Sequence, residues 1–159
     1  AVINGIAAGA GFALSLACDF RVSTELGKFT TAFSKVGFSG DFGITYFLSK
    51  IVGISKAKEL LFFSEIIDAN EAQKLGIVNY LIDSNNKEDF TQQLKNKIKS
   101  QAPIATKFMK KNFLNLESGI LEKSLEQEAL YQMICSETQD HKNAIEAFVK
   151  KEKVVFRGK

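Results

Sequence analysis

Residues 1–19 read AVINGIAAGAGFALSLACD, and this stretch decides the class of fold. The run AVIN is apolar and β-branched, which predicts a strand, and residues 12–18 are apolar all round, as in a buried helix. Gly9-Ala10-Gly11 lies between them and predicts a tight turn. A strand that enters a helix through a glycine-rich turn indicates an α/β layer architecture.

Such a turn also points backbone N–H groups at a ligand oxygen, and the helix dipole favours negative charge there. A dinucleotide site is one interpretation, but the third glycine of that fingerprint is absent, since Leu14 occupies its position. An oxyanion hole for a carbonyl oxygen is another. The third is structural: only glycine and alanine let a strand and a helix pack so closely. Spacing alone favours this structural explanation.

The composition narrows the function further. The chain has 159 residues, 45% of them apolar, and a net charge of +3, which suits a globular chain of about one domain. Its lysines are interspersed with acidic residues, so we expect no nucleic-acid partner. It contains no apolar run of membrane-spanning length, so we expect no membrane partner. Because it opens without Met on a strand-like run, we expect it to be the C-terminal part of a longer protein.

Cysteine and histidine are too few for two common kinds of site. Cys18 and Cys135 lie far apart, and His141 is the only histidine, which argues against a Cys/His metal cluster and against a Ser-His-Asp triad. We expect buried free thiols and a cytoplasmic location.

The remaining pattern predicts further strands and then mainly helices. Strands are expected at 20–24, 28–33 and 77–82, and helices at 44–53 (ending on Gly53), 55–63, 69–76 (capped by Asp68), from Pro103 onward, 117–137 and 141–153. The organisation expected is therefore a core at 1–82 and a helical region at 83–159. The second region has more apolar surface than isolated helices need, and we expect it to face a neighbouring subunit through Phe108, Met109, Phe113, Leu125, Leu130, Tyr131 and Phe148.

Asp41 stands out within residues 35–48, KVGFSGDFGITYFL, because its neighbours are apolar or hydroxylic. It suits the N-cap of a helix that begins near Phe42. It equally suits a carboxylate in an apolar wall, where desolvation raises its pKa and fits it for proton transfer. The two interpretations are compatible.

Four blocks in order resemble the enoyl-CoA hydratase/isomerase (crotonase) superfamily, over essentially the whole chain. They are INGIAAGAGFALSLACD (3–19), FTTAFSKVGFSGDFGITYFLSKIVG (29–53), IIDANEAQKLGIVNYLID (66–83) and AIEAFVKKEKVVFRGK (144–159). The resemblance implies an α/β fold: a crotonase-like spiral of ββα turns, here partial, followed by a helical region that builds homotrimers, often paired into hexamers.

The resemblance also implies a site for an acyl-CoA thioester, with CoA as part of the substrate and no metal or other cofactor. One oxyanion-hole N–H comes from the segment that precedes this chain in the family, and the other is the Ala10 N–H, between Gly9 and Gly11. Lys151 matches a position that approaches the CoA of a neighbouring subunit, although a solvated helix lysine explains it equally well.

The acid/base positions separate the branches of the family. Hydratases carry two glutamates at the positions of Ala13 and Phe33, and their absence argues against hydration. Asp41 matches the aspartate of the isomerase branch associated with phenylacetate degradation, although Gly40 and Phe42 replace that branch's usual proline and small residue. The same aspartate is the nucleophile of 4-chlorobenzoyl-CoA dehalogenase, which also uses a tryptophan at the position of Phe33, and this chain has none.

We therefore expect an enoyl-CoA isomerase in which Asp41 moves a proton beside the Ala10 N–H. Asp41 is expected to point into an apolar cavity lined by Phe12, Phe33, Phe38 and Phe42. Two alternatives stay open: a hydratase with a carboxylate from the preceding segment, and a non-catalytic acyl-CoA-binding or oligomerising module. An Asp41 that points into a cavity near the Ala10 N–H would support the isomerase, and one that faces bulk solvent as a plain cap would overturn it.

Overall fold

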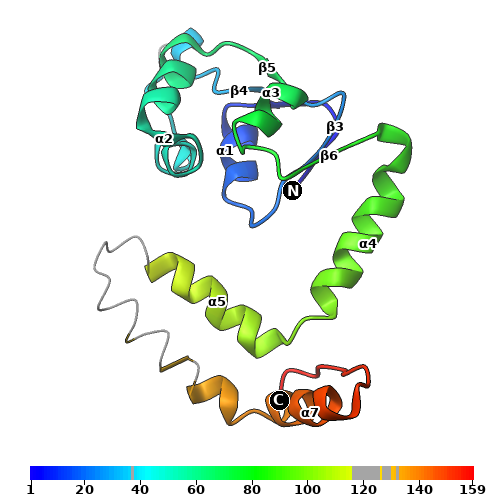
Figure 1. The fold of residues 1–159 in the computed structure, drawn as a ribbon. Coiled ribbons are helices and arrows are strands. Elements are labelled where there is room, and N and C mark those ends of the chain that lie inside the picture. Colours follow the sequence, from blue (N-terminus) through cyan, green and yellow to red (C-terminus); the bar gives the residue numbers. More distant parts are fainter. Residues whose placement is uncertain (37, 116–125, 127–129, 132) are drawn as a thin grey trace. The chain divides into compact units, whose positions relative to one another are not determined.

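The computed structural model describes residues 1–36, 38–115, 126, 130, 131 and 133–159. It contains two compact units, Ala1–Thr91 and Gln92–Lys159 (Figure 1). These units divide within helix α4 (Lys87–Lys99), whereas the sequence suggested a boundary after residue 82. Most of the helix expected at 117–137, with Leu125, lies outside the described residues.

The first unit repeats a strand–strand–helix pattern. Its elements are β1 (Val2–Ile3), β2 (Ile6–Ala8), α1 (Ala10–Leu16), β3 (Val22–Thr24), β4 (Lys28–Thr30), the 3-10 helix η1 (Ser34–Val36), α2 (Ile44–Phe63), β5 (Ile67–Asp68), α3 (Ala69–Lys74), β6 (Tyr80–Ile82) and the 3-10 helix η2 (Ser84–Asn86). Strands β1, β3 and β6 form one parallel sheet, while β2, β4 and β5 form another, in which β4 and β5 are antiparallel. Each of the first two turns of the chain thus adds one strand to each sheet, which makes a spiral.

Strand β2 brings the glycine turn beside β4. Ala7 pairs with Phe29 and Ala8 with Thr30, in parallel register, so the chain leaves β2 for the turn where β4 ends. Strand β2 was not expected from the sequence. This strand is short and two of its residues are alanine, which has no preference for strands. Its extended conformation therefore comes from pairing with β4.

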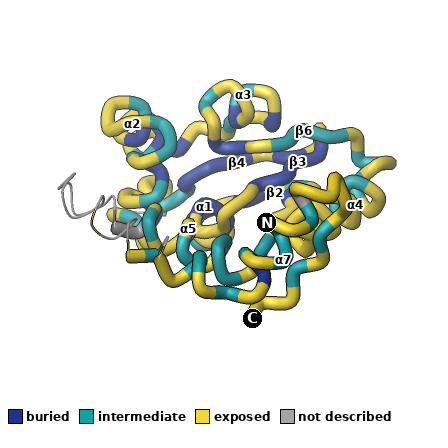
Figure 2. The backbone as a smooth tube through the Cα atoms, turned by 60° about the horizontal axis from the view of Figure 1, so that its bottom comes forward, coloured by how far each residue is buried: buried dark blue, intermediate teal, exposed yellow. Residues whose placement is uncertain are grey.

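The core of the first unit lies between α1, α2 and the sheets, where Figure 2 colours much of the backbone as buried. Helix α1 packs on α2, and the Phe12 ring lies 5.6 Å from that of Phe29, centroid to centroid. The expectation of a helix buried all round was wrong: Leu14 is 58% exposed, and Cys18, just past the helix, is exposed rather than a buried thiol. A seven-residue helix with one packed face leaves the opposite face uncovered.

Local sequence signals explain several boundaries. Helix α2 is interrupted at Gly53 (φ 78°, ψ 158°), where the sequence predicted a helix end. The Asp68 carboxylate caps α3 by accepting from the Glu71 N–H at 2.8 Å, as its spacing indicated. Pro103 is the first residue of α5 (Pro103–Asn115), also as predicted.

The second unit contains the end of α4, α5 and α7 (Gln139–Lys150). Phe108 stacks on Tyr131 with ring centroids 4.3 Å apart, so two of the apolar side chains assigned to a neighbouring subunit contact each other. Met109, Phe113 and Leu130 are exposed, and the Phe148 side chain lies outside the described part. Within the described residues, no helix has both the length and the hydropathy to cross a membrane.

Candidate functional site

The glycine turn presents a backbone donor at the start of α1. Gly9 adopts φ 52° and ψ −119°, which glycine tolerates far better than other residues. Its N–H donates to the Thr30 carbonyl at 3.1 Å, and its carbonyl accepts from the Ala13 N–H at 3.0 Å. N–H groups in the first turn of a helix have no acceptor within it, and Gly9 has no side chain to cap them. The half-buried Ala10 N–H is therefore a suitable donor to a ligand oxygen.

The end of β4 and the Phe33 ring lie against this turn. A Cβ placed on Gly9 would lie 3.7 Å from the Thr31 carbonyl oxygen and 3.9 Å from Phe33 Cζ. The structure thus brings Phe33 to the turn, next to Gly9. A Cβ on Gly11 would meet nothing within 4 Å, so packing within the described residues does not require glycine there. Gly11 instead lines an open cavity of about 540 Å³ with β1, β2 and the exposed side of α1.

Asp41 is exposed and does not cap α2. Gly43, in the left-handed region at φ 73°, is the N-cap, and no side chain caps the helix. Asp41 Oδ1 accepts instead from the next N–H along the chain, that of Phe42, at 2.7 Å, and its carbonyl accepts from the Ile44 N–H at 3.1 Å. The N-cap interpretation was therefore wrong, because α2 begins at Ile44, after the N-cap Gly43, and not at Phe42 directly after Asp41.

The apolar wall predicted around Asp41 is not present in this chain. Phe38 is 69% exposed and Phe42 is 53% exposed, so neither ring packs over the carboxylate to exclude water. Phe12 was also misplaced: at 1% exposure it belongs to the core and cannot line an accessible pocket. Phe33 is partly buried against the core and lies beside the glycine turn. Asp41 does not line the open cavity beside Gly11, and it does not line the cavity between α7 and the C-terminal tail that is described next.

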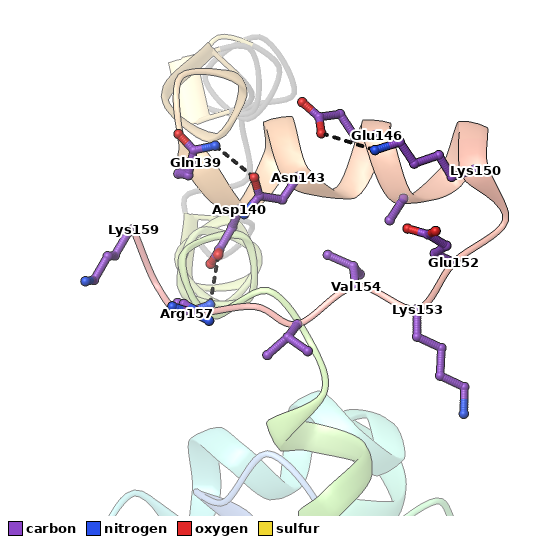
Figure 3. A pocket seen from close by; sticks show the side chains of 12 residues that line it. Gln139, Asp140, Asn143, Glu146, Lys150, Glu152, Lys153, Val154, Arg157 and Lys159 are labelled. Carbon is purple, nitrogen blue, oxygen red and sulfur yellow. Dashed lines mark hydrogen bonds and ion pairs between the residues drawn. The ribbon is translucent and has the colours of Figure 1, made fainter.

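The second unit has a cavity of about 380 Å³ between α7 and the C-terminal tail (Figure 3). Asp140 is 2% exposed, and its carboxylate accepts from the Arg157 N–H at 2.8 Å and the Gly158 N–H at 2.6 Å, which ties the tail to the helix. The cavity lining carries both signs of charge, and Lys150 lies 4.0 Å from Glu146. Lys151 follows α7 in the left-handed region (φ 56°), is exposed, and does not line this cavity.

Sequence reasoning missed the residues that hold the turn in place. Thr30 and Thr31 lie at the end of β4 and contact the turn through their carbonyl groups, which no side-chain motif reveals. Among the described residues, no group of three or more His, Cys, Asp and Glu side chains is arranged to hold a metal ion.

Comparison with known proteins gives a consistent result. The chain matches the enoyl-CoA hydratase/isomerase family over residues 1–159. It is 30% identical to 1,2-epoxyphenylacetyl-CoA isomerase of Escherichia coli K12 over 99% of this chain, and 32% identical to short-chain-enoyl-CoA hydratase of Clostridium acetobutylicum over 97%. The crystal structure of enoyl-CoA hydratase from Bacillus anthracis superposes with a TM-score of 0.93 at 30% identity, over 98% of this chain. The chain spans about 60% of the length of each of these proteins.

Proposed function

Because the chain belongs to the enoyl-CoA hydratase/isomerase family, we propose that it is part of an enoyl-CoA isomerase, which moves a carbon–carbon double bond along an acyl-CoA thioester. CoA enters as part of the substrate, and the proposed reaction needs neither a metal nor a redox cofactor. The fold is the crotonase-like spiral, and its superposition on family structures supports assigning the acyl-CoA chemistry to the glycine turn.

The Ala10 N–H and the Asp41 carboxylate act as one functional unit in this proposal. A proton next to a thioester carbonyl becomes acidic only when the enolate oxygen is stabilised, and a backbone N–H aimed at that oxygen supplies this stabilisation. Asp41 then accepts a proton from C2 of a 3-enoyl-CoA and returns it to C4, so that the double bond moves to C2–C3. The proton count balances within the substrate, and the carboxylate is regenerated.

The observation that carries the choice of isomerase is the apolar character of the side chains beside the turn. Phe33 places a ring against Gly9, and Ala13 is a fully buried methyl group in α1. Neither side chain can take a proton from water or give one to carbon. At these two positions the family's hydratases carry the glutamates that perform both steps, so proton transfer in this chain falls to Asp41.

Asp41 is exposed in this chain, so in this proposal the bound substrate helps to shield its carboxylate from water. Phe38 and Phe42 present open rings on the segment that carries Asp41. We propose that the acyl group packs on these rings and, with the parts of the protein outside this chain, excludes water from the carboxylate. Desolvation of this kind raises a carboxylate pKa and makes it a stronger base. A homotrimer or hexamer with Lys151 near the CoA of a neighbouring subunit belongs to the same proposal.

Product analysis of the full-length protein tests this function. Incubated with a 3-enoyl-CoA, it is expected to yield the 2-enoyl-CoA with no 3-hydroxyacyl-CoA, and incubated with the 2-enoyl-CoA it is expected to add no water. Accumulation of 3-hydroxyacyl-CoA from either substrate would contradict the proposal and identify a hydratase.

Hydratase is the second candidate, and the observation in its favour is the 32% identity to the short-chain-enoyl-CoA hydratase. That reaction requires a carboxylate from outside this chain. If neither product forms although acyl-CoA binds, the protein is instead a binding or oligomerising module.

A further inference from the structure

Ser64 has an unusual place in the first unit. It directly follows α2, adopts φ 48° and ψ 38°, and is fully buried. Residues with a side chain seldom adopt this left-handed conformation, which glycine adopts without steric cost. Its N–H closes the last turn of α2 by donating to the Leu60 carbonyl at 3.0 Å. The backbone would therefore accept glycine at this position, and the serine side chain needs a separate explanation.

The Ser64 hydroxyl joins three segments through hydrogen bonds. It lies 2.8 Å from Thr31 Oγ1 and 2.7 Å from Ser34 Oγ. Thr31 Oγ1 donates its only proton to the Leu60 carbonyl at 2.9 Å, so it accepts from Ser64. The Ser64 hydroxyl also lies 3.4 Å from the Leu61 carbonyl, but the shorter contact to Thr31 is the better use of its one proton, so Ser64 accepts from Ser34. The direction of donation is Ser34 to Ser64 to Thr31 to the Leu60 carbonyl.

One end of this network fixes the glycine turn. Thr31 follows Thr30 at the end of β4, and the Thr30 carbonyl accepts from the Gly9 N–H at 3.1 Å. The Thr30 hydroxyl also donates to the Ser64 carbonyl at 3.0 Å. Buried backbone with its hydrogen-bonding groups satisfied is held rigidly. The conformation of Gly9, and with it the direction of the Ala10 N–H, therefore depends on where Ser64 holds the end of β4.

The other end begins the segment that leads to Asp41. Ser34 is the first residue of η1 and directly follows Phe33, whose ring lies against Gly9 and whose carbonyl accepts from the Phe38 N–H at 3.0 Å. We infer that Ser64 is a positioning residue, which holds the Ala10 N–H and the start of the Asp41 segment in register through Thr31 and Ser34. The inference rests on the proposed function for its catalytic meaning, but the coupling itself is measurable without any activity.

The test compares variants of the full-length protein by hydrogen exchange and by kinetics. Ser64→Gly removes the hydroxyl and suits the left-handed backbone, so the fold is retained. Thr31→Val removes the other hydroxyl with little change of shape, while Thr31→Ser keeps it and is the rescue variant. Ser55→Ala replaces an exposed serine of α2 that lies outside the network, and it is the matched control.

We expect Ser64→Gly and Thr31→Val to speed exchange of the Gly9 N–H about tenfold, the order that the loss of one hydrogen bond gives. Exchange in α3 should stay unchanged, and Thr31→Ser and Ser55→Ala should match the wild type. On a 3-enoyl-CoA, kcat should fall about tenfold with little change in KM, because the network does not touch the substrate.

Unchanged exchange at Gly9 in both Ser64→Gly and Thr31→Val would overturn the inference, whatever happens to kcat. A uniform acceleration throughout the first unit would also overturn it, since Ser64 would then stabilise the fold without positioning the turn. If the wild-type protein has no isomerase activity, the proposed function fails, and the exchange result alone decides the inference.

Discussion

Arg21 is a buried side chain that donates hydrogen bonds to backbone carbonyls near the end of α1. It is 7% exposed, and its guanidinium donates to the carbonyls of Ile77, Cys18 and Leu16, while its own backbone exchanges hydrogen bonds with Asn79 at 2.8 and 2.9 Å. Burial lowers the pKa of this guanidinium. One side chain thus satisfies carbonyls at the C-terminal end of α1 and fixes the approach to β6, which anchors the helix that begins with Ala10.

Replacing Arg21 should therefore destabilise the fold. Arg21→Met keeps the aliphatic stem but leaves buried carbonyls without donors, and we expect a loss of about 3 kcal/mol in the free energy of unfolding, from a penalty of roughly 1–3 kcal/mol for each unsatisfied group. Urea denaturation measures this loss. The control is Arg157→Met, at an exposed arginine, with an expected loss below about 0.5 kcal/mol. Equal losses in the two variants would contradict the assigned role of Arg21.

The backbone conformation around the candidate site was predictable from the sequence. The burial of the individual side chains there was not. The turn at Gly9 before the helix at Ala10 was predicted correctly, because a glycine-rich turn before a helix has few possible conformations. The placement of Phe12 in a pocket wall and the burial of Asp41 were wrong. Each depends on which distant residues cover the side chain, and the chain around residues 12 and 41 is apolar in either case. Arg21 was missed because its partners are carbonyl groups, which every residue has.

At the scale of the element, α7 and the tail that follows it are held together by Asp140. Its two carboxylate oxygens accept from consecutive N–H groups, those of Arg157 and Gly158, and its own N–H donates to the Lys159 carbonyl at 3.1 Å. Asp140 also lies in the first turn of the helix, where a negative charge is favourable. One residue thus stabilises the helix and fixes the tail that closes the cavity of Figure 3.

Asp140→Asn should release this tail. The amide can accept from only one of the two N–H groups, and we expect a loss of about 2 kcal/mol in unfolding free energy, because hydrogen bonds to a charged group are worth roughly 1.5–3 kcal/mol. Amide exchange of residues 152–159 should become faster. Asp83→Asn is the matched control, because within the described part of the chain that exposed carboxylate accepts only from the nearby Asn85 N–H, at 2.8 Å. Unchanged tail exchange in Asp140→Asn would refute the role of Asp140.

Helix boundaries were predicted correctly from the sequence where a single residue sets them. Gly53, Asp68 and Pro103 interrupt, cap and begin helices as predicted, since their conformational preferences act locally. Strand β2 was not predicted, and Asp41 was wrongly expected to cap α2. In both cases the deciding interaction is made elsewhere: β2 pairs with β4, and the backbone before α2 turns at Gly43, which is the N-cap.

In the first unit as a whole, the spiral brings segments that are distant in the sequence side by side. Successive turns place β2 beside β4, so the glycine turn and the segment that leads to Asp41 leave the same sheet next to each other. The four sequence blocks indicated this fold, and the match to family structures confirms it. The order of the blocks carries that information, and the chain spans about 60% of the length of its relatives.

The central claim is that Asp41 transfers the proton that moves the double bond. The most direct measurement incubates the full-length protein and its Asp41→Asn variant with a 3-enoyl-CoA in deuterated water, and follows double-bond position and deuterium at C2 and C4. We predict migration with deuterium at C4 in the wild type, and a rate at least about a hundredfold lower in the variant, the usual contribution of a general base. Equal migration in both proteins would contradict the claim.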